Sequence, residues 1–344
     1  MQPSNIEPNQ PWTIDIFKPE DAEGVAALFL EVYGRGYPIK TFIDPERLKD
    51  ENARRTTISS VAKTPRGDII GHNAIFSSAP SRVIYELGSG VVHPSYRGGA
   101  GIFTQLNLHG LEMAKKFGVA AIFGEPVCNH VFAQKMGHSI HTISRALEID
   151  LLPAEAYEKE KSSSGRVGAF QNFKTVIPRP HQVYLPTPYE EALRFCYDEM
   201  DDQRDFARAD QPIPEGTPTT VKPEYFEFAR VARLAFRDAG TDFRRQLEAQ
   251  EAAHVRQGAA VIQVWLKMTW PWLGEIVSAA NDLGYFFGGA LPRWFDDDGL
   301  LLQKTFQKPN FEGLVIHFDR AKKIYEFVKA DWSRLNRESG SQAL

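Results

Sequence analysis

Apolar and polar positions recur along the chain with periods that predict alternating strands and helices. Residues 12–17 alternate as a short strand, and residues 18–34 carry apolar positions at helical spacing behind an acidic first turn. The pattern then predicts, in order, a strand pair within 56–80, a strand at 82–92, a helix at 102–118, a strand at 119–127, a short helix at 129–139 and a strand at 142–153.

A charged, serine-rich stretch without a clear period follows, and beyond it the order of elements begins again. The pattern predicts a strand near 183–186, a helix at 187–200, a strand pair turning at Lys222-Pro223, a helix at 241–258, a strand at 259–268, a helix at 269–284, two strands at 285–294 and 299–306, and an amphipathic helix at 319–335. Both halves therefore run strand, helix, strands, helix, strand, which suggests an internal duplication.

This order predicts an α+β fold with a mixed sheet and more than one domain. The chain has 344 residues, more than one hydrophobic core usually serves. We expect a first domain at 11–152, a linker at 153–182, a second domain at 183–308 and a C-terminal helical extension at 309–344.

Composition narrows the class of protein. Hydrophobic residues make up 42% of the chain and charged residues 24%, as in ordinary globular proteins. The formal charge of −4 provides no field for holding a polyanion, so we expect no nucleic-acid partner. No basic run precedes an apolar core at the N-terminus, no window resembles a membrane span, and only two cysteines are present. These features favour a cytoplasmic protein that acts on small molecules without a membrane partner.

The most informative stretch is Val91 to Leu106, where an apolar strand breaks at His93-Pro94, passes through glycines and becomes helical at Ile102. The first turn of a helix leaves backbone N–H groups unpaired, and glycines before it let the main chain curl around phosphate oxygens. Arg97 adds a fixed charge with the fork geometry that a diphosphate accepts. The stretch is also compatible with a plain glycine-rich turn that carries a surface arginine.

This junction resembles the acyl-CoA loop of the GNAT acyltransferase superfamily. Val92-His93-Pro94-Ser95-Tyr96-Arg97 matches the family's approach to the loop, and Arg97-Gly98-Gly99-Ala100-Gly101-Ile102-Phe103 is similar to a common variant with one residue inserted. The order of elements over about 11–152 matches as well. The resemblance implies two GNAT-like folds in tandem. The second is degenerate, because the stretch after 259–268 has no Arg-x-x-Gly-x-Gly motif.

The resemblance implies acetyl-CoA or another acyl-CoA as cosubstrate. The family's cofactor pairs with the fourth strand and lies on the loop, which gives as binding residues Gly90, Val91, Val92, Arg97, Gly98, Gly99, Ala100, Gly101, Ile102 and Phe103. Asn129 matches an asparagine that often contacts the cofactor in this family, and it is equally compatible with a helix cap.

The chemistry implied is acyl transfer from a thioester to an amine, which requires a base, an oxyanion donor and an acid. Glu86 is the expected base, because some family members carry a glutamate at this position of the strand; the alternative is a solvent-facing residue. Glu125, within an apolar strand, is a rival base or an anchor for the substrate's ammonium group. The family's usual acid is a tyrosine where this chain has Met136, so His130, Tyr33 or Tyr37 are candidates for that role.

The function expected from the resemblance is therefore an acyltransferase, most simply an acetyltransferase, for a small amine or amino-acid-like acceptor, in a monomer or homodimer. The departures from the family pattern leave two alternatives: a catalytically weak acyl-CoA sensor, and a protein that binds another phosphate compound. We expect no metal site, since Cys128, His130, His138 and His141 follow no recognised ligand spacing. Asp296-Asp297-Asp298 is expected to form a hairpin turn.

Overall fold

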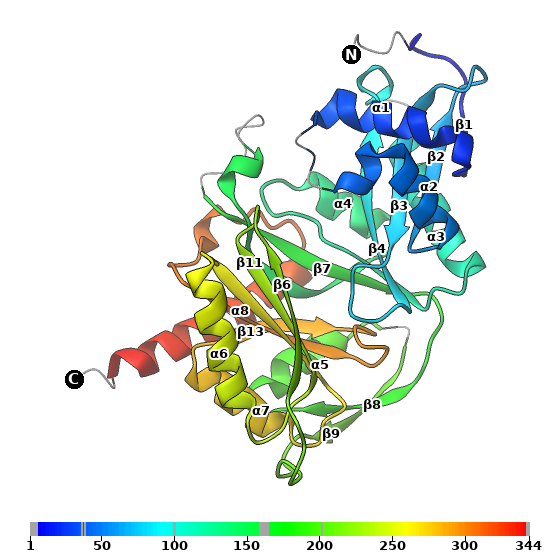
Figure 1. The fold of residues 1–344 in the computed structure, drawn as a ribbon. Helices are drawn as coiled ribbons and strands as arrows, with labels where there is room; N and C mark the ends of the chain where they lie inside the picture. Colours follow the sequence, from blue (N-terminus) through cyan, green and yellow to red (C-terminus); the bar gives the residue numbers. More distant parts are fainter. Residues whose placement is uncertain are drawn as a thin grey trace. The chain divides into compact units, whose positions relative to one another are not determined.

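The computed structural model describes residues 6–35, 37, 39–98, 101–157, 165–200 and 202–341, the side chains of 338–341 excepted. Its helices and strands alternate in a mixed α/β order, as the sequence predicts. The chain divides into two compact units, Met1–Gly124 and Glu125–Leu344, and Figure 1 labels most of their helices and strands. No helix among the described residues is long and apolar enough to span a membrane.

The first unit is built on five strands in sequence order, antiparallel except for the parallel pair β4 and β5. The elements are β1 (Thr13–Ile16), α1 (Ala22–Tyr33), α2 (Pro45–Ala53), β2 (Thr57–Lys63), β3 (Ile69–Phe76), β4 (Ile84–Val92), α3 (Ile102–Lys116) and β5 (Ala121–Gly124). Helix α3 thus provides the long crossover connection that two parallel strands require.

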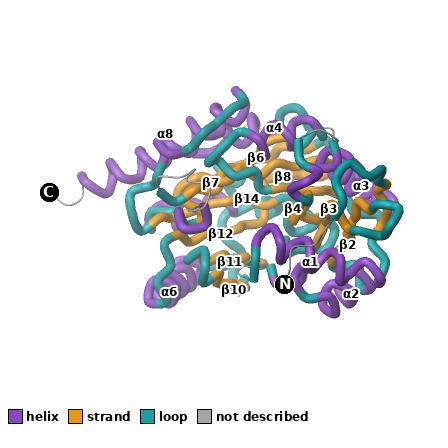
Figure 2. The backbone as a smooth tube through the Cα atoms, turned by 90° about the horizontal axis from the view of Figure 1, so that it is seen from above, coloured by secondary structure: helices purple, strands orange, loops and turns teal. Residues whose placement is uncertain are grey.

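Helices cover both faces of this first sheet. Ala74 and Val91 pack in one hydrophobic cluster with Phe29 of α1. On the other face, a Cβ added to Gly71 would lie 3.0 Å from the side chains of Ile102 and Leu106 in α3. Figure 2 shows β2, β3 and β4 between α1 and α2 on one side and α3 on the other.

The second unit contains a seven-stranded sheet in the order β7-β6-β13-β14-β12-β11-β10, and a separate parallel pair, β8 and β9. Its elements are α4 (Phe132–Ser139), β6 (Ile143–Leu152), β7 (Val167–Thr175), β8 (His181–Leu185), α5 (Glu190–Tyr197), β9 (Arg204–Arg208), β10 (Thr220–Phe226), β11 (Val231–Asp238), α6 (Phe243–Arg256), β12 (Val261–Lys267), α7 (Leu273–Asp282), β13 (Phe286–Leu291), β14 (Gly299–Thr305) and α8 (Asp319–Ser341). Strands β11 and β12 are parallel, with α6 between them in the chain, and β14 lies between β12 and β13.

Three expectations about elements are corrected. The predicted linker, 153–182, contains strand β7, which pairs antiparallel with β6; the charged stretch before it misled the prediction. The turn expected at Lys222-Pro223 lies instead at 227–230, and both residues are inside β10, where an edge strand tolerates proline. Helix α2 was not expected; Asp44 caps it by accepting hydrogen bonds from the N–H groups of Glu46 and Arg47.

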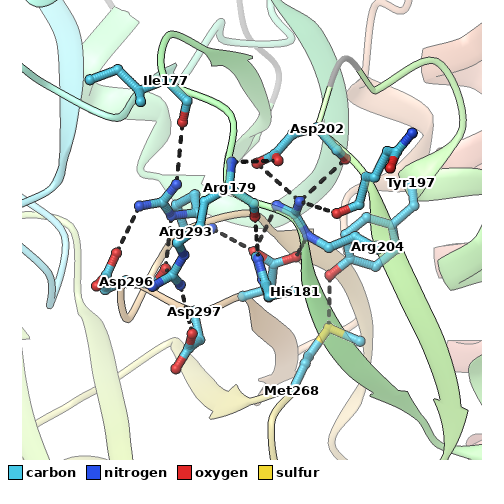
Figure 3. A network of polar contacts seen from close by, with 12 residues as sticks. Ile177, Arg179, His181, Tyr197, Asp202, Arg204, Met268, Arg293, Asp296 and Asp297 are labelled. Atoms are coloured by element: carbon cyan, nitrogen blue, oxygen red, sulfur yellow. Dashed lines mark hydrogen bonds and ion pairs between the residues drawn. The ribbon is translucent and has the colours of Figure 1, made fainter.

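The acidic run after β13 forms a turn, as expected, and an ionic network holds it (Figure 3). The fully buried Asp298 carboxylate accepts hydrogen bonds from Arg204 Nε at 2.6 Å and from the Arg293 N–H at 2.8 Å, and lies 3.2 Å from His181 Nε2. Burial alone would raise the pKa of Asp298, but His181 and Arg204 outweigh it, so this pKa lies well below its usual range. The turn is thus tied to β8 and β9.

Candidate functional site

Strand β4 is bulged in its middle. His72 of β3 faces Val91, but Ala74, two residues along, faces Gly88, so β4 contains one residue more than its partner. Ser89 lies at this bulge, and its backbone is in the left-handed conformation, with φ of 52°. A bulge of this kind bends the strand and re-aims its backbone groups.

Strand β4 also separates from β5 after Glu86, just before the bulge. The parallel register runs from Ile84 opposite Ala121 to Glu86 opposite Phe123, and no further pairs join the two strands among the described residues. Within the described part of the chain, Val91 and Val92 pair with β3 and with no other strand. The other edge of β4 at Gly90, Val91 and Val92 can therefore accept an extended ligand as an added strand.

The described residues on either side of Gly99 and Ala100, between β4 and α3, have backbone features that suit an anion. Arg97 folds back so that its Nε–H donates to the Val92 carbonyl at 2.9 Å. Gly98 has φ of 90°, and Gly101, at the start of α3, has φ of 64°, a region that glycine enters without strain. The predicted binding residues Gly99 and Ala100 lie outside the described residues. The first N–H groups of α3 have no intrahelical acceptor and carry the positive end of the helix dipole.

The two residues that open α3 have different roles. The side chain of Ile102 is buried in a cluster with Leu106, so only its backbone is available to a ligand. The ring of Phe103 is 38% exposed and lies against Gly90, where an added Cβ would be 2.5 Å from a ring carbon. Gly90 therefore lets the first turn of α3 approach β4.

On the face of β4 opposite α3, the predicted base lies near two tyrosines. Glu86 is half-buried and accepts a hydrogen bond from the Ser78 hydroxyl at 2.7 Å. The rings of Tyr33 and Tyr37 stack with centroids 5.0 Å apart. Burial raises the pKa of Tyr37 to about 12; the Ser89 hydroxyl opposes this, and Tyr33 and Glu86 add to it. A carboxylate that can accept a proton thus neighbours a phenol that stays protonated near neutral pH.

His72, which sequence reasoning missed, supports the bulge. Its ring is fully buried, with the rings of Phe29 and Phe42 at 5.3 and 5.1 Å between centroids. The Nδ1–H donates to the Ser89 carbonyl at 3.0 Å, and Nε2 has no hydrogen-bond partner among the described residues. Burial lowers the pKa of His72 to about 4, so the ring is neutral near pH 7. A histidine inside an apolar strand was the available signal.

Acid should unfold this region through His72. Its pKa falls from 6.5 to about 4 on folding, so the unfolded chain binds more protons between these values, and stability is lost as the pH falls through that window. Between pH 7 and pH 4, we expect the natural protein to lose about 3 kcal/mol more than His72→Asn, which keeps a donor near Nδ1 but does not titrate. Urea unfolding at a series of pH values measures this, and parallel profiles would contradict it.

Glu125, the first residue of the second unit, is ion-paired. Its Oε1 accepts hydrogen bonds from an Arg233 NH2 group and from Gln171 Nε2, each at 3.1 Å. Arg233 also lies 3.3 Å from Glu148, which is fully buried. Burial, and secondly the charge of Glu125, raise the pKa of Glu148 to about 7. This pairing explains how an acidic residue follows an apolar strand, and it holds the Glu125 carboxylate in place.

The other two predicted residues of the second unit precede α4. That helix begins at Phe132 behind Val131, so Asn129 is not its N-cap residue. Asn129 is 7% exposed. The ring of His130 lies 5.5 Å from that of Phe132, and its Nδ1 is buried without a hydrogen-bond partner in the described part of the chain. No group of three His, Cys, Asp or Glu side chains among the described residues is arranged to hold a metal ion.

Comparisons with known proteins place the chain beside acetyltransferases of known structure. No protein-family model and no curated protein matches it. It is similar to the ribosomal-protein-S5-alanine acetyltransferase from Vibrio fischeri (14% identity, 48% of this chain and 92% of that chain, TM-score 0.38). It is also similar to the ribosomal-protein-S18-alanine N-acetyltransferase from Escherichia coli (16% identity, 49% of this chain and 96% of that chain, TM-score 0.38). A third similar structure is a putative acetyltransferase from Salmonella typhimurium with its cofactor acetyl-CoA (12% identity, 49% of this chain and 96% of that chain, TM-score 0.39). Because these TM-scores lie below 0.5, the likeness carries no conclusion about function.

Proposed function

We propose that this protein is an acyl-CoA-dependent N-acyltransferase, most simply an acetyltransferase, that modifies the amine of a small or amino-acid-like acceptor. Two features of the first unit together carry the proposal. Strand β4 is bulged and separates from β5, and a glycine turn precedes α3. The free edge at Gly90 to Val92 suits an extended pantetheine arm with its amides. The turn, the first N–H groups of α3 and Arg97 suit a diphosphate.

The residues opposite α3 can supply the proton transfers. In the proposed reaction the amine nitrogen attacks the thioester carbon, Glu86 accepts the amine proton, and the carbon–sulfur bond breaks to release the thiolate of coenzyme A, which takes up a proton. Tyr37 is proposed as a hydrogen-bond donor on this face. With a pKa of about 12 it stays neutral and donates a hydrogen bond more readily than it gives up its proton. Asn129 and His130 belong to the second unit, and their roles as a cofactor contact and a proton donor stay predictions.

For the second half, we propose a GNAT-like fold that has lost its cofactor groove. In the chain, α6 lies between the parallel strands β11 and β12, as α3 lies between β4 and β5. In this proposal the equivalent of the Arg97 loop is therefore the stretch before α6, and not the stretch after β12. That stretch, Arg237-Asp238-Ala239-Gly240, is covered by the chain itself. The Gly240 N–H donates to the Thr219 hydroxyl at 2.9 Å, and the carbonyl of Thr217 occupies the space beside the Gly240 Cα.

The end of β12 is covered in the same way. The Tyr184 N–H, in β8, donates to the Met268 carbonyl at 2.7 Å, and the Gln211 N–H donates to the Pro271 carbonyl at 3.1 Å. Backbone of the second unit thus occupies the space beyond the end of β12, the strand that corresponds to β5 in this proposal. We therefore expect one acyl-CoA per chain, held by the first unit.

The test is calorimetric titration of the full chain with acetyl-CoA. We expect binding with a stoichiometry near one, and a loss of affinity of about 10-fold or more in Arg97→Glu, because a carboxylate would face the diphosphate. Arg82→Glu, an equal charge reversal at an exposed position outside the loop, should bind as the natural protein does. Absence of binding by the folded natural protein would refute the proposed function, and a stoichiometry near two would refute the closed second groove.

A further inference from the structure

Two buried asparagines link helix α3 to strand β3 in the first unit. The Asn73 side chain, on β3, donates from Nδ2 to Asn107 Oδ1, on α3, at 3.0 Å. The Asn107 Nδ2 donates in turn to the Phe103 carbonyl, one helical turn earlier, at 2.7 Å. Asn73 Oδ1 accepts from the Ala74 N–H at 2.9 Å, so both carboxamides use their oxygen and their nitrogen. The two residues are 1% and 2% exposed, so water cannot replace these bonds.

Asn73 occupies the position of β3 at which β4 is bulged. The register of β3 with β4 shifts between His72 and Ala74, so Asn73 lies at the shift. Neighbouring strand residues point to opposite faces of a sheet. His72 binds the Ser89 carbonyl of the bulge and packs against Phe29 of α1, whereas Asn73 reaches α3 on the other face. The asparagine pair therefore ties α3 to the part of the sheet that lies beside the bulge.

The carbonyl that Asn107 binds belongs to the first turn of α3. The peptide group between Phe103 and Thr104 carries this carbonyl and also the Thr104 N–H, which is the third N–H of the helix and has no intrahelical acceptor. Because a peptide group is planar, a hydrogen bond to its carbonyl orients its N–H as well, and such chains of bonds polarise one another. The bonds from Asn73 through Asn107 thus act on a donor in the turn where the diphosphate is proposed to bind.

We propose that Asn73 and Asn107 are positioning residues for the diphosphate of the acyl-CoA, because their hydrogen bond sets the place of the first turn of α3 on β3. This inference rests on the proposed function. The interface around the pair is apolar, with Leu87 and Ile75 at 3.0 and 3.7 Å from a Cβ added to Gly110 of α3. Apolar side chains there would pack in several similar arrangements, whereas a buried, fully bonded amide pair permits one.

A double variant of the full chain, Asn73→Leu with Asn107→Leu, tests the role by calorimetric titration with acetyl-CoA. Leucine has nearly the shape of asparagine, and replacing both partners of a buried hydrogen bond by apolar groups changes stability little. We expect the thermal midpoint to move by less than about 4 °C. The affinity for acetyl-CoA should fall by about 5–10-fold, because the first turn of α3 loses its fixed place.

Steady-state kinetics separates positioning from chemistry in the same variant. The KM for acetyl-CoA should rise by about the factor by which the affinity falls, and kcat should change by less than about twofold. The reason is that Glu86, the proposed base, lies on the face of β4 opposite α3 and keeps its hydrogen bond from Ser78. A role in the chemical step would lower kcat instead.

Asn52→Leu is the matched control. Asn52, on α2, makes the same kind of link: its Nδ2 donates to the Leu48 carbonyl one turn earlier at 3.0 Å, and its Oδ1 accepts from the Ser59 N–H of β2 at 2.9 Å. Helix α2 lies on the face of the sheet opposite α3 (Figure 2). This variant should bind acetyl-CoA as the natural protein does, whatever it loses in stability.

Asn73→Ala decides the question if the double variant does not fold, because it leaves the sequence of α3 unchanged; we expect it to lower the affinity by about 3-fold or more. Unchanged affinity in these variants, beside a natural protein that binds acetyl-CoA, would overturn the positioning role and leave the proposed function standing. An equal loss in Asn52→Leu would also overturn it, because affinity would then follow stability. Failure of the natural protein to bind would refute the proposed function and this inference with it.

Discussion

Glu86→Gln should lower the turnover of acetyl-CoA with an amine acceptor by about 10²–10⁴-fold while leaving the affinity for acetyl-CoA nearly unchanged. The amide has the shape of the carboxylate but cannot accept the proton of the attacking amine. Glu86 lies on the face of β4 with Tyr37, whereas the proposed cofactor contacts are the strand edge and the turn into α3. Chemistry and cofactor binding should therefore separate in this variant.

The measurement combines steady-state kinetics, on an acceptor found by screening amines, with calorimetry. Glu112→Gln is the matched control, an exposed glutamate on α3 whose change should alter neither quantity. Full turnover in Glu86→Gln would remove Glu86 as the base. If the natural protein binds acetyl-CoA but acetylates no amine, that result would favour an acyl-CoA sensor over an enzyme.

Asp298→Ala should destabilise the second unit by about 3 kcal/mol, because it leaves His181 without its carboxylate and Arg204 with the Asp202 carboxylate as its remaining ion pair. Both the Arg204 side chain and Asp298 are almost completely buried, at 1% and 0% exposure, so solvent cannot replace the lost partner. The turn between β13 and β14 would also lose the acceptor of the Arg293 N–H. Urea unfolding followed by circular dichroism measures the loss.

Asp282→Ala provides the comparison. Asp282 pairs with Arg244 at 3.1 Å, but both side chains are more than half exposed, and removing such a pair changes stability by about 1 kcal/mol or less. A loss in Asp298→Ala no larger than in Asp282→Ala would show that the buried network contributes little to the free energy of unfolding.

Helices and strands whose apolar residues recur with a clear period were predictable from the sequence, and elements without such a period were not. Strand β4 and helices α3, α6 and α7 follow from apolar spacing and from glycine stops, which are local signals. Strand β7 was hidden because it follows a charged, serine-rich stretch, and its pairing with β6 joins distant residues. Helix α2 was missed because its sequence, Pro45 to Ala53, is mostly polar and has one buried residue, Leu48.

The junction of β4 and α3 is predictable from local sequence, because glycines, a proline break and an arginine act on the backbone next to them. Local sequence also placed Glu86 on that strand. The side chains and backbone groups that surround these residues are known only from the tertiary structure. It joins His72 to Ser89 across 17 positions and Arg233 to Glu125 across 108, it brings Tyr37 to the face of Glu86, and it brings the Thr219 hydroxyl to the Gly240 N–H before α6. Such contacts depend on packing between distant segments, which no local period encodes.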